Sequence, residues 1–430
     1  MARYGAAMPF RFVHTADIHL DSPLRSLALR NRDLAELIGD ATRRALVAIV
    51  DLCLEEQVDA LVIAGDLYDG DQTSMKTARF LASQMERLHR AGIKVFKVRG
   101  NHDAMSRITQ ELILPPSVKV FGGRAEAVQL RAGTLDVVLH GLSFAKPQAP
   151  ESLLPKFKQP TPDAINIGIL HTSLAGAPGH DVYAPCSAAE LHGWGFDYWA
   201  LGHIHTRAQH AGARTVIMPG IPQGRDINEA GPKTASLVTI REDRSIVVEE
   251  RPTSLAQFER IPVDLSGVET WHGAVEAVEH AVGRARDRAV SEHLVGRLML
   301  RGDTPLAWRL RRDRDLLLAE VEQRLEGLGR SWVDKIELAV AAPVAAGAPS
   351  SAADPVLELG KLMRDDILDQ HGIRQTVREM VERVRGELPP EARGFGGDSE
   401  AAFDAFLDRL LDEGCEDVIA RLKTSDGGAD

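Results

Sequence analysis

ALVIAGD at residues 60–66 and IKVFKVRGNHD at residues 93–103 are the two stretches that decide the fold. Each is a short apolar run, rich in β-branched residues, that ends in glycine and a polar side chain, and a helical pattern over residues 73–90 separates them. Upstream, FRFVHTAD at residues 10–17 precedes a helical stretch that continues to residue 57. This alternation of strand and helix predicts a layered α/β domain.

Further strand-like runs follow with fewer helices between them, so the second half of the domain is predicted to be rich in strands. They are LDVVLHG, AINIGILHT, DYWALGH, RTVIMPG, ASLVTI and SIVVEE. Polar side chains stand where the runs end, at Asp17, Asp66, Asn101, His171 and His203. Ligands of layered α/β folds lie beyond the carboxyl ends of the strands, so we expect these side chains to share one rim.

Five short motifs at these strand ends contain side chains that can ligate a metal ion. The motifs DIH, GD, GNHD, the histidine after GIL and GHIH supply Asp17, His19, Asp66, Asn101, His171, His203 and His205. Carboxylate, amide and imidazole donors without a thiolate suit hard or borderline divalent ions such as manganese, iron or zinc. Because a carboxylate can bridge two cations that flank a phosphoryl group, the composition of the set favours a two-metal phosphoesterase.

The motifs differ in how specific they are. An Asp-x-His pair is common in solvated loops, and GHIH alone could equally be a turn with exposed histidines, whereas GNHD is rare by chance. The sequence contains no GxGxxG, GxxxxGK[ST], CxxC, HExxH or GxSxG motif that would indicate another chemistry. The metal-binding interpretation therefore depends on the five motifs occurring together.

Charge and cysteine content restrict the partners and the compartment. Residues 1–260 carry 29 basic and 29 acidic residues, so the net charge of −11 comes from the 22 basic and 33 acidic residues that follow. Binding of nucleic acid through bulk positive charge is excluded, and any such contact must be local or assisted by a partner. Widely spaced Cys53, Cys186 and Cys415 argue against a disulfide framework. Without a signal peptide or membrane-spanning stretch, we expect a cytoplasmic protein with no membrane partner.

Four segments are predicted. Residues 1–255 form the domain with the metal motifs, residues 256–340 a smaller α+β domain with a long helix over 305–328, and residues 341–354 a linker rich in alanine and proline. Residues 355–430 are predicted to be helical, with one helix over about 355–386 and a final helix. The final helix has an apolar stripe that must be buried, either on the chain's own second domain or in a partner: Phe403, Phe406, Leu407, Leu410 and Leu411.

In their order along residues 10–250, the metal motifs resemble those of the calcineurin-like metallophosphoesterases. The resemblance implies a layered metallophosphoesterase sandwich followed by a capping domain and a helical C-terminal extension. It also implies two divalent ions, of which we expect Mn²⁺. One ion would be bound by Asp17, His19 and His205, the other by Asn101, His171 and His203, with Asp66 bridging.

The family also implies roles for two residues of GNHD. His102 corresponds to the histidine outside the metal shell that stabilises the transition state or protonates the leaving oxygen. Asp103 is predicted to orient His102 through a hydrogen bond. A histidine bound to a metal could not donate that proton, so the chemistry needs this separate residue.

Flanking sequence resembles the DNA repair exonuclease branch, the SbcD-type nucleases and most closely YhaO-like proteins. The resemblance is carried by HTADIHLDSPLRSL, by the segment from GDLYDGD to GNHD and by DYWALGHIHTRAQ. In PGIPQGR at residues 219–225, Ile221 replaces the asparagine typical of YhaO-like proteins. The resemblance implies a DNA nuclease that works with a coiled-coil, SMC-like ATPase. A homodimer is a second possible assembly of the chain.

Two alternatives stay open at this point. The site could act on a small nucleotide as a phosphodiesterase or phosphatase, or the chain could be a scaffold with structural metals. Arginines of the second domain favour a polymeric anionic substrate, unless they only form a solvated face paired with Asp303, Asp313 and Asp315. These arginines are Arg297, Arg301, Arg309, Arg311, Arg312 and Arg314.

Overall fold

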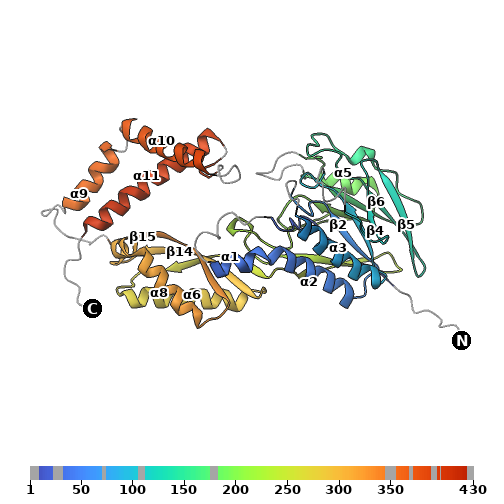
Figure 1. The fold of residues 1–430 in the computed structure, drawn as a ribbon, viewed down its shortest axis with the longest axis horizontal. Helices are drawn as coiled ribbons and strands as arrows, with labels where there is room; N and C mark the ends of the chain where they lie inside the picture. The colour runs from blue at the N-terminus through green and yellow to red at the C-terminus, as the bar shows by residue number, and fades with distance from the viewer. Residues whose placement is uncertain are drawn as a thin grey trace. The chain divides into compact units, whose positions relative to one another are not determined.

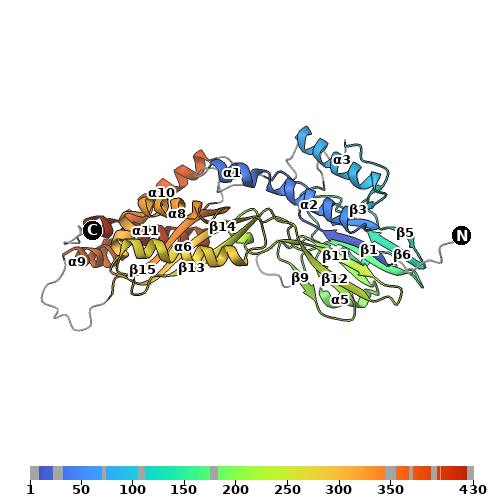
Figure 2. The same ribbon diagram turned by 90° about the horizontal axis from the view of Figure 1, so that it is seen from below.

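A computed structural model describes residues 9–22, 32–69, 74–104, 112–174, 183–343, 355–367, 371–388, 395–397 and 399–423. The chain divides into two compact units (Figures 1 and 2). The first comprises residues 1–259 and 288–295, and the second comprises residues 260–287 and 296–430.

Within its described residues, the first unit contains two six-stranded sheets. In the order β12-β11-β1-β2-β3-β4, the first sheet consists of Ile246–Pro252, Thr234–Ile240, Phe10–Thr15, Ala60–Ala64, Lys94–Val98 and Val118–Val120. In the order β5-β6-β7-β8-β10-β9, the second consists of Glu126–Ala132, Leu135–Gly141, Ile165–His171, Tyr198–Gly202, Thr215–Met218 and Ala208–His210.

The first sheet is antiparallel on the side of β11 and β12 and parallel elsewhere, and the second sheet has a parallel centre with an antiparallel strand at each edge. Strands β1 to β4 are parallel neighbours, with Phe12 opposite Ala60 and Ala60 opposite Lys94. Strands β6, β7, β8 and β10 are likewise parallel, with Ile167 opposite Tyr198. Parallel strands end at a common edge, so the loops after β1, β2 and β3 come together, as do those after β7 and β8.

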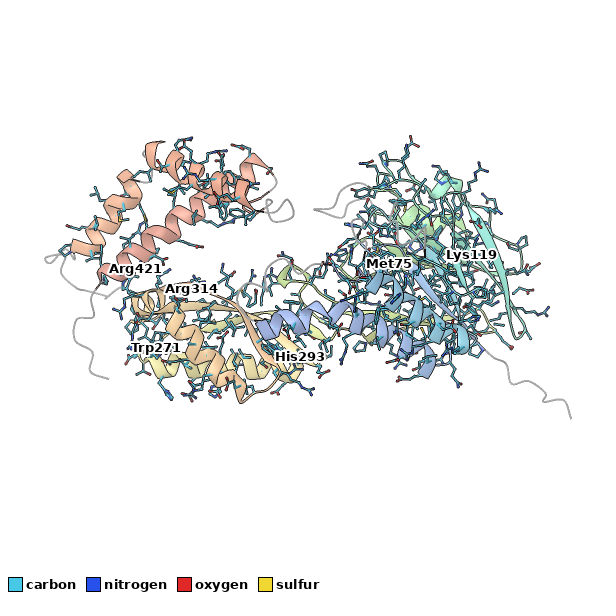
Figure 3. The ribbon with its side chains drawn as sticks, viewed as in Figure 1. Met75, Lys119, Trp271, His293, Arg314 and Arg421 are labelled. Atoms are coloured by element: carbon cyan, nitrogen blue, oxygen red, sulfur yellow. The ribbon has the colours of Figure 1, made fainter. Side chains whose placement is uncertain are left out.

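Helices cover the outer face of the first sheet. They are α2 (Ala41–Glu55) and α3 (Met75–Arg90), and α1 (Arg32–Gly39) contacts α2. Leu46, Ile49 and Val50 of α2 recur at helical spacing and are buried with Leu61 of β2, which explains why this amphipathic segment packs on the sheet. Met75, at the start of α3, is exposed (Figure 3). Shorter helices belong to the same unit: η1 (Leu154–Lys156), α5 (Ala188–Trp194) and η2 (Ile227–Glu229).

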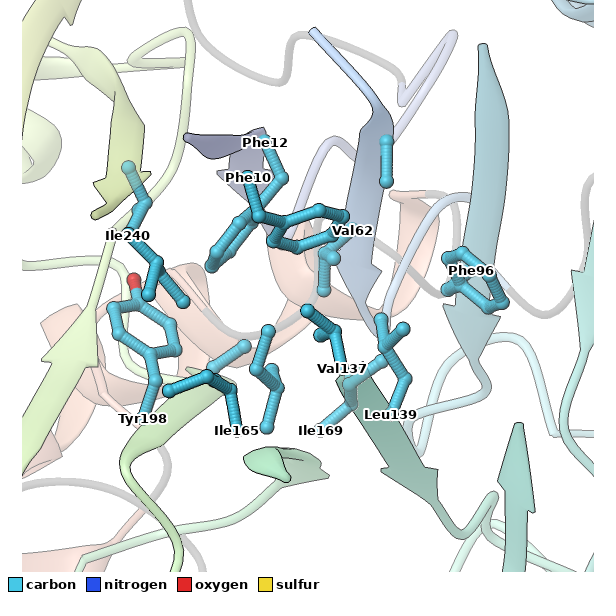
Figure 4. Close-up of a cluster of buried hydrophobic side chains, with 14 of the residues drawn as sticks. Phe10, Phe12, Val62, Phe96, Val137, Leu139, Ile165, Ile169, Tyr198 and Ile240 are labelled. Atoms are coloured by element: carbon cyan, nitrogen blue, oxygen red, sulfur yellow. The ribbon is translucent and has the colours of Figure 1, made fainter. Parts of the chain in front are cut away.

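The main core lies between the two sheets. Phe10 and Phe12 of β1 and Phe96 of β3 are buried against Ile169 and Tyr198 of the second sheet (Figure 4). Strands with apolar residues on both faces are typical of sheets that are covered on both sides. The layered α/β fold predicted for this part of the chain is confirmed.

The second unit contains a set of helices and most of a small sheet, whose first two strands begin in the first unit. Its sheet has the order β13 (Ala256–Asp264), β14 (His293–Asp303) and β15 (Ser331–Ala341). The helices are α6 (Trp271–Arg288), α7 (Ala307–Arg312), α8 (Arg314–Glu326), α9 (Pro355–Leu362), the π-helical turn η3 (Met363–Ile367), α10 (His371–Glu387) and α11 (Glu400–Leu422).

Two predicted helices differ from the structure. The helix expected over residues 305–328 is broken between α7 and α8 at Asp313, whose φ of −106° and ψ of 34° leave the helical region. The helix expected over residues 355–386 is divided into α9, η3 and α10, and residues 368–370 lie outside the described part. Most of the predicted linker, residues 344–354, also lies outside it.

The apolar stripe of the final helix is only partly buried. Phe403 and Leu407 of α11 are buried against Val381 of α10, and Phe395 packs beside them. Leu410 is exposed. The buried part of the stripe is therefore covered by a neighbouring helix of the chain itself. Among the residues that the structure describes, no helix is both long and apolar enough to span a membrane.

Candidate metal centre

The structure brings all seven predicted metal ligands to the carboxyl edges of the two sheets. Asp17 and His19 follow β1, Asp66 follows β2 and Asn101 follows β3. On the second sheet, His171 is the last residue of β7, and His203 and His205 follow β8. Residues separated by almost the whole first unit thus meet because the parallel strands of each sheet end together.

Asp17, His19 and His205 form the first cluster, with ligand atoms within 4.8 Å of one another. The Nε2 atoms of His19 and His205 are 3.2 Å apart. Each Nδ1 lies 2.7 Å from a carboxylate oxygen, of Asp69 and Glu229 respectively. The carboxylates keep the proton on Nδ1, so two Nε2 lone pairs face each other, an arrangement that a cation between them would stabilise.

Asp66, His171 and His203 form the second cluster, again within 4.8 Å. His171 Nε2 lies 3.2 Å from Asp66 Oδ2 and 3.0 Å from Asn101 Oδ1, so Asn101 joins this cluster. His171 Nδ1 lies 2.9 Å from the Ala64 carbonyl oxygen, which fixes the direction of the ring.

A backbone contact connects the two clusters. The His203 N–H donates to Asp17 Oδ2 over 2.9 Å. The clusters therefore lie next to each other, with Asp17, His19 and His205 in one and Asn101, His171, His203 and Asp66 in the other. Their carboxylate, amide and imidazole composition fits a pair of divalent ions.

The backbone at the site is held in an unusual conformation. Asp17, His19, Asp66 and His203 have φ values of 52°, 44°, 49° and 106°. A non-glycine residue at positive φ costs of order 1–3 kcal/mol and persists where the surrounding structure imposes it. Close packing restricts Gly100 as well, since a Cβ atom there would lie 2.3 Å from Asp66 Oδ1 and 2.6 Å from His171 Nε2.

Burial and neighbouring charges shift the pKa values of the buried ligands. Burial raises the pKa of Asp17. Burial acts in the same direction on Asp66, but the charge and hydrogen bond of His171 outweigh it and lower the pKa of Asp66. Burial lowers the pKa of His171, yet Asp66 and Asp17 together raise it to about 9. Because imidazole must be neutral to bind a metal, an ion here would displace the proton of His171.

His102 lies beside the clusters and remains accessible. Its side chain is 46% exposed, and its Nδ1 lies 3.2 Å from Asp69 Oδ1. The bond to Asp69 raises the pKa of His102 and so favours the protonated ring. The His102 N–H donates to Asp66 Oδ1 over 2.9 Å, which ties this residue to the second cluster. A protonated, exposed imidazole at this position is suited to donate a proton to a leaving oxygen.

The carboxylate that contacts His102 is Asp69, and the prediction that Asp103 orients His102 is wrong. Asp103 is fully buried and accepts hydrogen bonds from the N–H groups of Gly100 (2.7 Å) and Leu67 (3.3 Å). Its Oδ2 lies 2.7 Å from Lys97 Nζ, on a side chain that is only 4% exposed. With both oxygens occupied in this way, Asp103 fixes the loops after β2 and β3 to each other.

Sequence reasoning also missed the two carboxylates that hold ligand histidines. Asp69 follows Asp66 by three residues in GDLYDGD, so its place beside the loop after β2 was available from the sequence. Glu229 belongs to η2, is separated from His205 by 24 residues and carries no motif. Its role depends on the fold and could not have been found by spacing.

Comparison with known proteins identifies the family of the chain. The family model of calcineurin-like phosphoesterases matches residues 10–207, and that of the metallophosphoesterase YhaO middle domain matches residues 258–341. An "Uncharacterized metallophosphoesterase YhaO" of Bacillus subtilis is 31% identical over 300 residues, which cover 68% of this chain and 72% of that protein.

Archaeal proteins named "DNA double-strand break repair protein Mre11" are also similar. That of Methanocaldococcus jannaschii is 30% identical over 206 residues, or 46% of this chain and 51% of the relative, so the match spans about half of its length. That of Halobacterium salinarum is 22% identical over 396 residues, or 87% of this chain and 94% of the relative. The chain therefore belongs to the calcineurin-like metallophosphoesterase family, which makes it a metal-dependent phosphoester hydrolase.

Proposed function

We propose that this hydrolase is a two-metal DNA phosphodiesterase, an exonuclease or endonuclease of the SbcD-type DNA repair branch. The observation that carries the proposal is the convergence of seven metal donors from two sheets beside one exposed histidine. When bound, two divalent ions, which we take to be Mn²⁺, would supply an activated water and neutralise charge on the phosphoryl oxygens.

The side chains of the site divide the remaining tasks. Asp17, His19 and His205 would hold one ion and Asn101, His171 and His203 the other, and Asp66, which lies with His171 and His203, would be shared between them. His102 donates a proton to the leaving oxygen, and Asp69 keeps the ring charged and directed. Asp103 contributes by fixing the loops that carry Asp66 and Asn101.

DNA as the substrate is supported by the relatives named Mre11 and by the flanking sequence. Several arginines of the second unit are already paired. Arg297 contacts Asp334 at 2.6 Å, Arg312 contacts Asp313 at 2.8 Å, and Arg314, which is labelled in Figure 3, donates to the Ile336 carbonyl oxygen. Because these arginines are paired within the chain, they do not indicate a DNA-binding surface, and the proposal of a DNA substrate rests on the relatives and on the flanking sequence.

A coiled-coil, SMC-like ATPase is the partner we propose for the helical C-terminal segment. Met380 (58% exposed) and Val384 (50% exposed) of α10 and Leu410 of α11 present apolar surface that the described residues leave accessible. A groove or helix of a partner could cover such surface. The variant Met380→Glu/Val384→Glu should lose co-purification with the ATPase and keep cleavage of a small phosphodiester. Retained co-purification would contradict the proposal that Met380 and Val384 contact the ATPase. Analytical sedimentation of the isolated chain tests separately whether it forms a homodimer.

We also propose that the protein works in the cytoplasm. Cys53, Cys186 and Cys415 are all buried and free, as expected in a reducing compartment.

The proposed activity is tested with purified protein, Mn²⁺ and three substrates in parallel: labelled single-stranded DNA, duplex DNA and a bis-phosphodiester chromogen. We expect cleavage of at least one DNA substrate that depends on added metal and is lost in His102→Ala. The matched control Glu86→Gln, which changes an exposed carboxylate paired with Arg90 on α3, should keep full activity. Cleavage of the chromogen without cleavage of DNA would favour a small-nucleotide phosphodiesterase instead.

A further inference from the structure

The predicted metal ligand His205 contacts the carboxylate of Glu229, and both oxygens of that carboxylate also accept hydrogen bonds from Arg225. Glu229 Oε1 lies 2.7 Å from His205 Nδ1. Arg225 donates to both oxygens of Glu229, through Nη2 to Oε1 at 2.7 Å and through its backbone N–H to Oε2 at 2.7 Å. The guanidinium and the carboxylate are both largely buried, with 24% and 12% of their side chains exposed. Glu229 thus has little freedom to leave His205.

The backbone of the same loop also holds His205. The N–H of Ile221 donates to the His205 carbonyl oxygen over 3.1 Å. Gly220, with φ of 74°, allows this approach because a Cβ atom there would lie 2.7 Å from that oxygen. The contact uses the backbone of Ile221, so isoleucine can replace asparagine at this position without losing it.

Gln223 anchors the loop from its other side. This side chain is 1% exposed, accepts from the N–H of Leu255 over 2.8 Å and donates to the carbonyl oxygen of Ala256 over 2.8 Å. Residues 220–229 are therefore held in place by these contacts, and this segment in turn contacts His205 through Ile221 and Glu229.

Three of the four ligand histidines differ in what contacts Nδ1. His19 has the Asp69 carboxylate and His205 has the Glu229 carboxylate, whereas His171 has the Ala64 carbonyl oxygen. A carboxylate on Nδ1 fixes the tautomer and makes the imidazole a stronger metal ligand than a carbonyl does. Glu229 contacts His205, which belongs to the first cluster, so its effect on metal binding is expected at the first cluster.

We propose that Glu229, fixed by Arg225, is a positioning residue that directs His205 Nε2 toward the metal and sets the affinity of that one metal site. This inference rests on the proposed two-metal function and deepens it by assigning a determinant of affinity to one of the two ions. Removal of such a carboxylate typically weakens metal binding by about 10- to 100-fold.

The test measures Mn²⁺ binding by equilibrium dialysis and by electron paramagnetic resonance, which reports coupled Mn²⁺ pairs. Wild-type protein should bind two ions. Glu229→Gln should bind one ion with unchanged Kd and the second about 10- to 100-fold more weakly, with loss of the coupled-pair signal at low Mn²⁺. The matched control is Glu56→Gln, because Glu56 also contacts two arginines, Arg11 at 2.6 Å and Arg251 at 2.8 Å, away from the site.

Two results would overturn the inference: both Kd values within about threefold of wild type in Glu229→Gln, or equal weakening of both sites. If circular dichroism shows that Glu229→Gln does not fold, Arg225→Met decides, since it leaves Glu229 in place and removes its support. Weakening of one site supports the inference, and unchanged binding contradicts it. Wild-type protein that binds no Mn²⁺ would overturn the proposed function itself, which separates the two failures.

Discussion

The buried ion pair of Lys97 and Asp103 should be one of the most important contacts for the stability of the first unit. Asp103→Asn leaves the Lys97 ammonium buried, with 4% of its side chain exposed and no counter-ion. Breaking a buried pair by removing one partner costs about 3–5 kcal/mol. The Tyr68 ring, 5.0 Å from Lys97 Nζ, offsets part of this cost, so we expect the free energy of unfolding to fall by about 3 kcal/mol.

The reverse substitution should cost less. Lys97→Met leaves the Asp103 carboxylate with the N–H groups of Gly100 and Leu67, so we expect a loss of about 2 kcal/mol. The double variant contains no unpaired buried charge, and its loss should be smaller than the sum of the two single losses by at least about 1–2 kcal/mol.

The assay is urea unfolding followed by circular dichroism at neutral pH with chelator present. Asp51→Asn is the control, because Asp51 pairs with Arg87 at the surface and its loss should change the free energy by less than about 1 kcal/mol. Single variants within about 1 kcal/mol of wild type, or strictly additive losses, would refute the reasoning.

Three further predictions concern the site and the core. In Asp69→Asn, His102 loses the bond that raises its pKa, so kcat at saturating Mn²⁺ should fall by about 10²- to 10⁴-fold. The basic limb of the pH profile of kcat should also move to lower pH, and an unchanged profile would contradict the role of Asp69 in keeping His102 protonated. In Gly100→Ala, the added methyl group meets Asp66 and His171, so dialysis should show weakened binding of Mn²⁺, and two ions bound with wild-type affinity would contradict it. Burial lowers the pKa of His14 from 6.5 to about 3, so the unfolded chain takes up a proton first as the pH falls. The contribution of neutral His14 to the free energy of unfolding is complete above pH 6.5 and is lost toward pH 3, by at most about 1.4 kcal/mol per pH unit. Urea unfolding at several pH values should therefore show a smaller dependence of this free energy on pH in His14→Phe than in wild type.

The layered fold and the assembly of the metal ligands could be predicted from the sequence for one reason. Strand ends are local features, and parallel strands such as β1, β2 and β3 must end at one edge, so residues after them converge. Asp17, Asp66 and Asn101 could therefore be placed together without knowledge of the packing.

Contacts that depend on side-chain direction could not be predicted in this way. Asp103 follows His102 directly, yet it points into the interior toward Lys97, while Asp69 from another loop contacts His102. A lysine in a buried strand was the one available sign, because Lys97 requires a buried counter-ion. The break of the predicted helix at Asp313 likewise depends on local backbone geometry that apolar periodicity does not reveal.

The binding of two metal ions at one edge of the sandwich is tested most directly by anomalous diffraction from crystals grown with Mn²⁺. The structure predicts two peaks about 3.5–4 Å apart, one among Asp17, His19 and His205 and one among Asn101, His171 and His203, with Asp66 between them. A single peak at saturating Mn²⁺, or peaks away from these residues, would contradict the two-metal site.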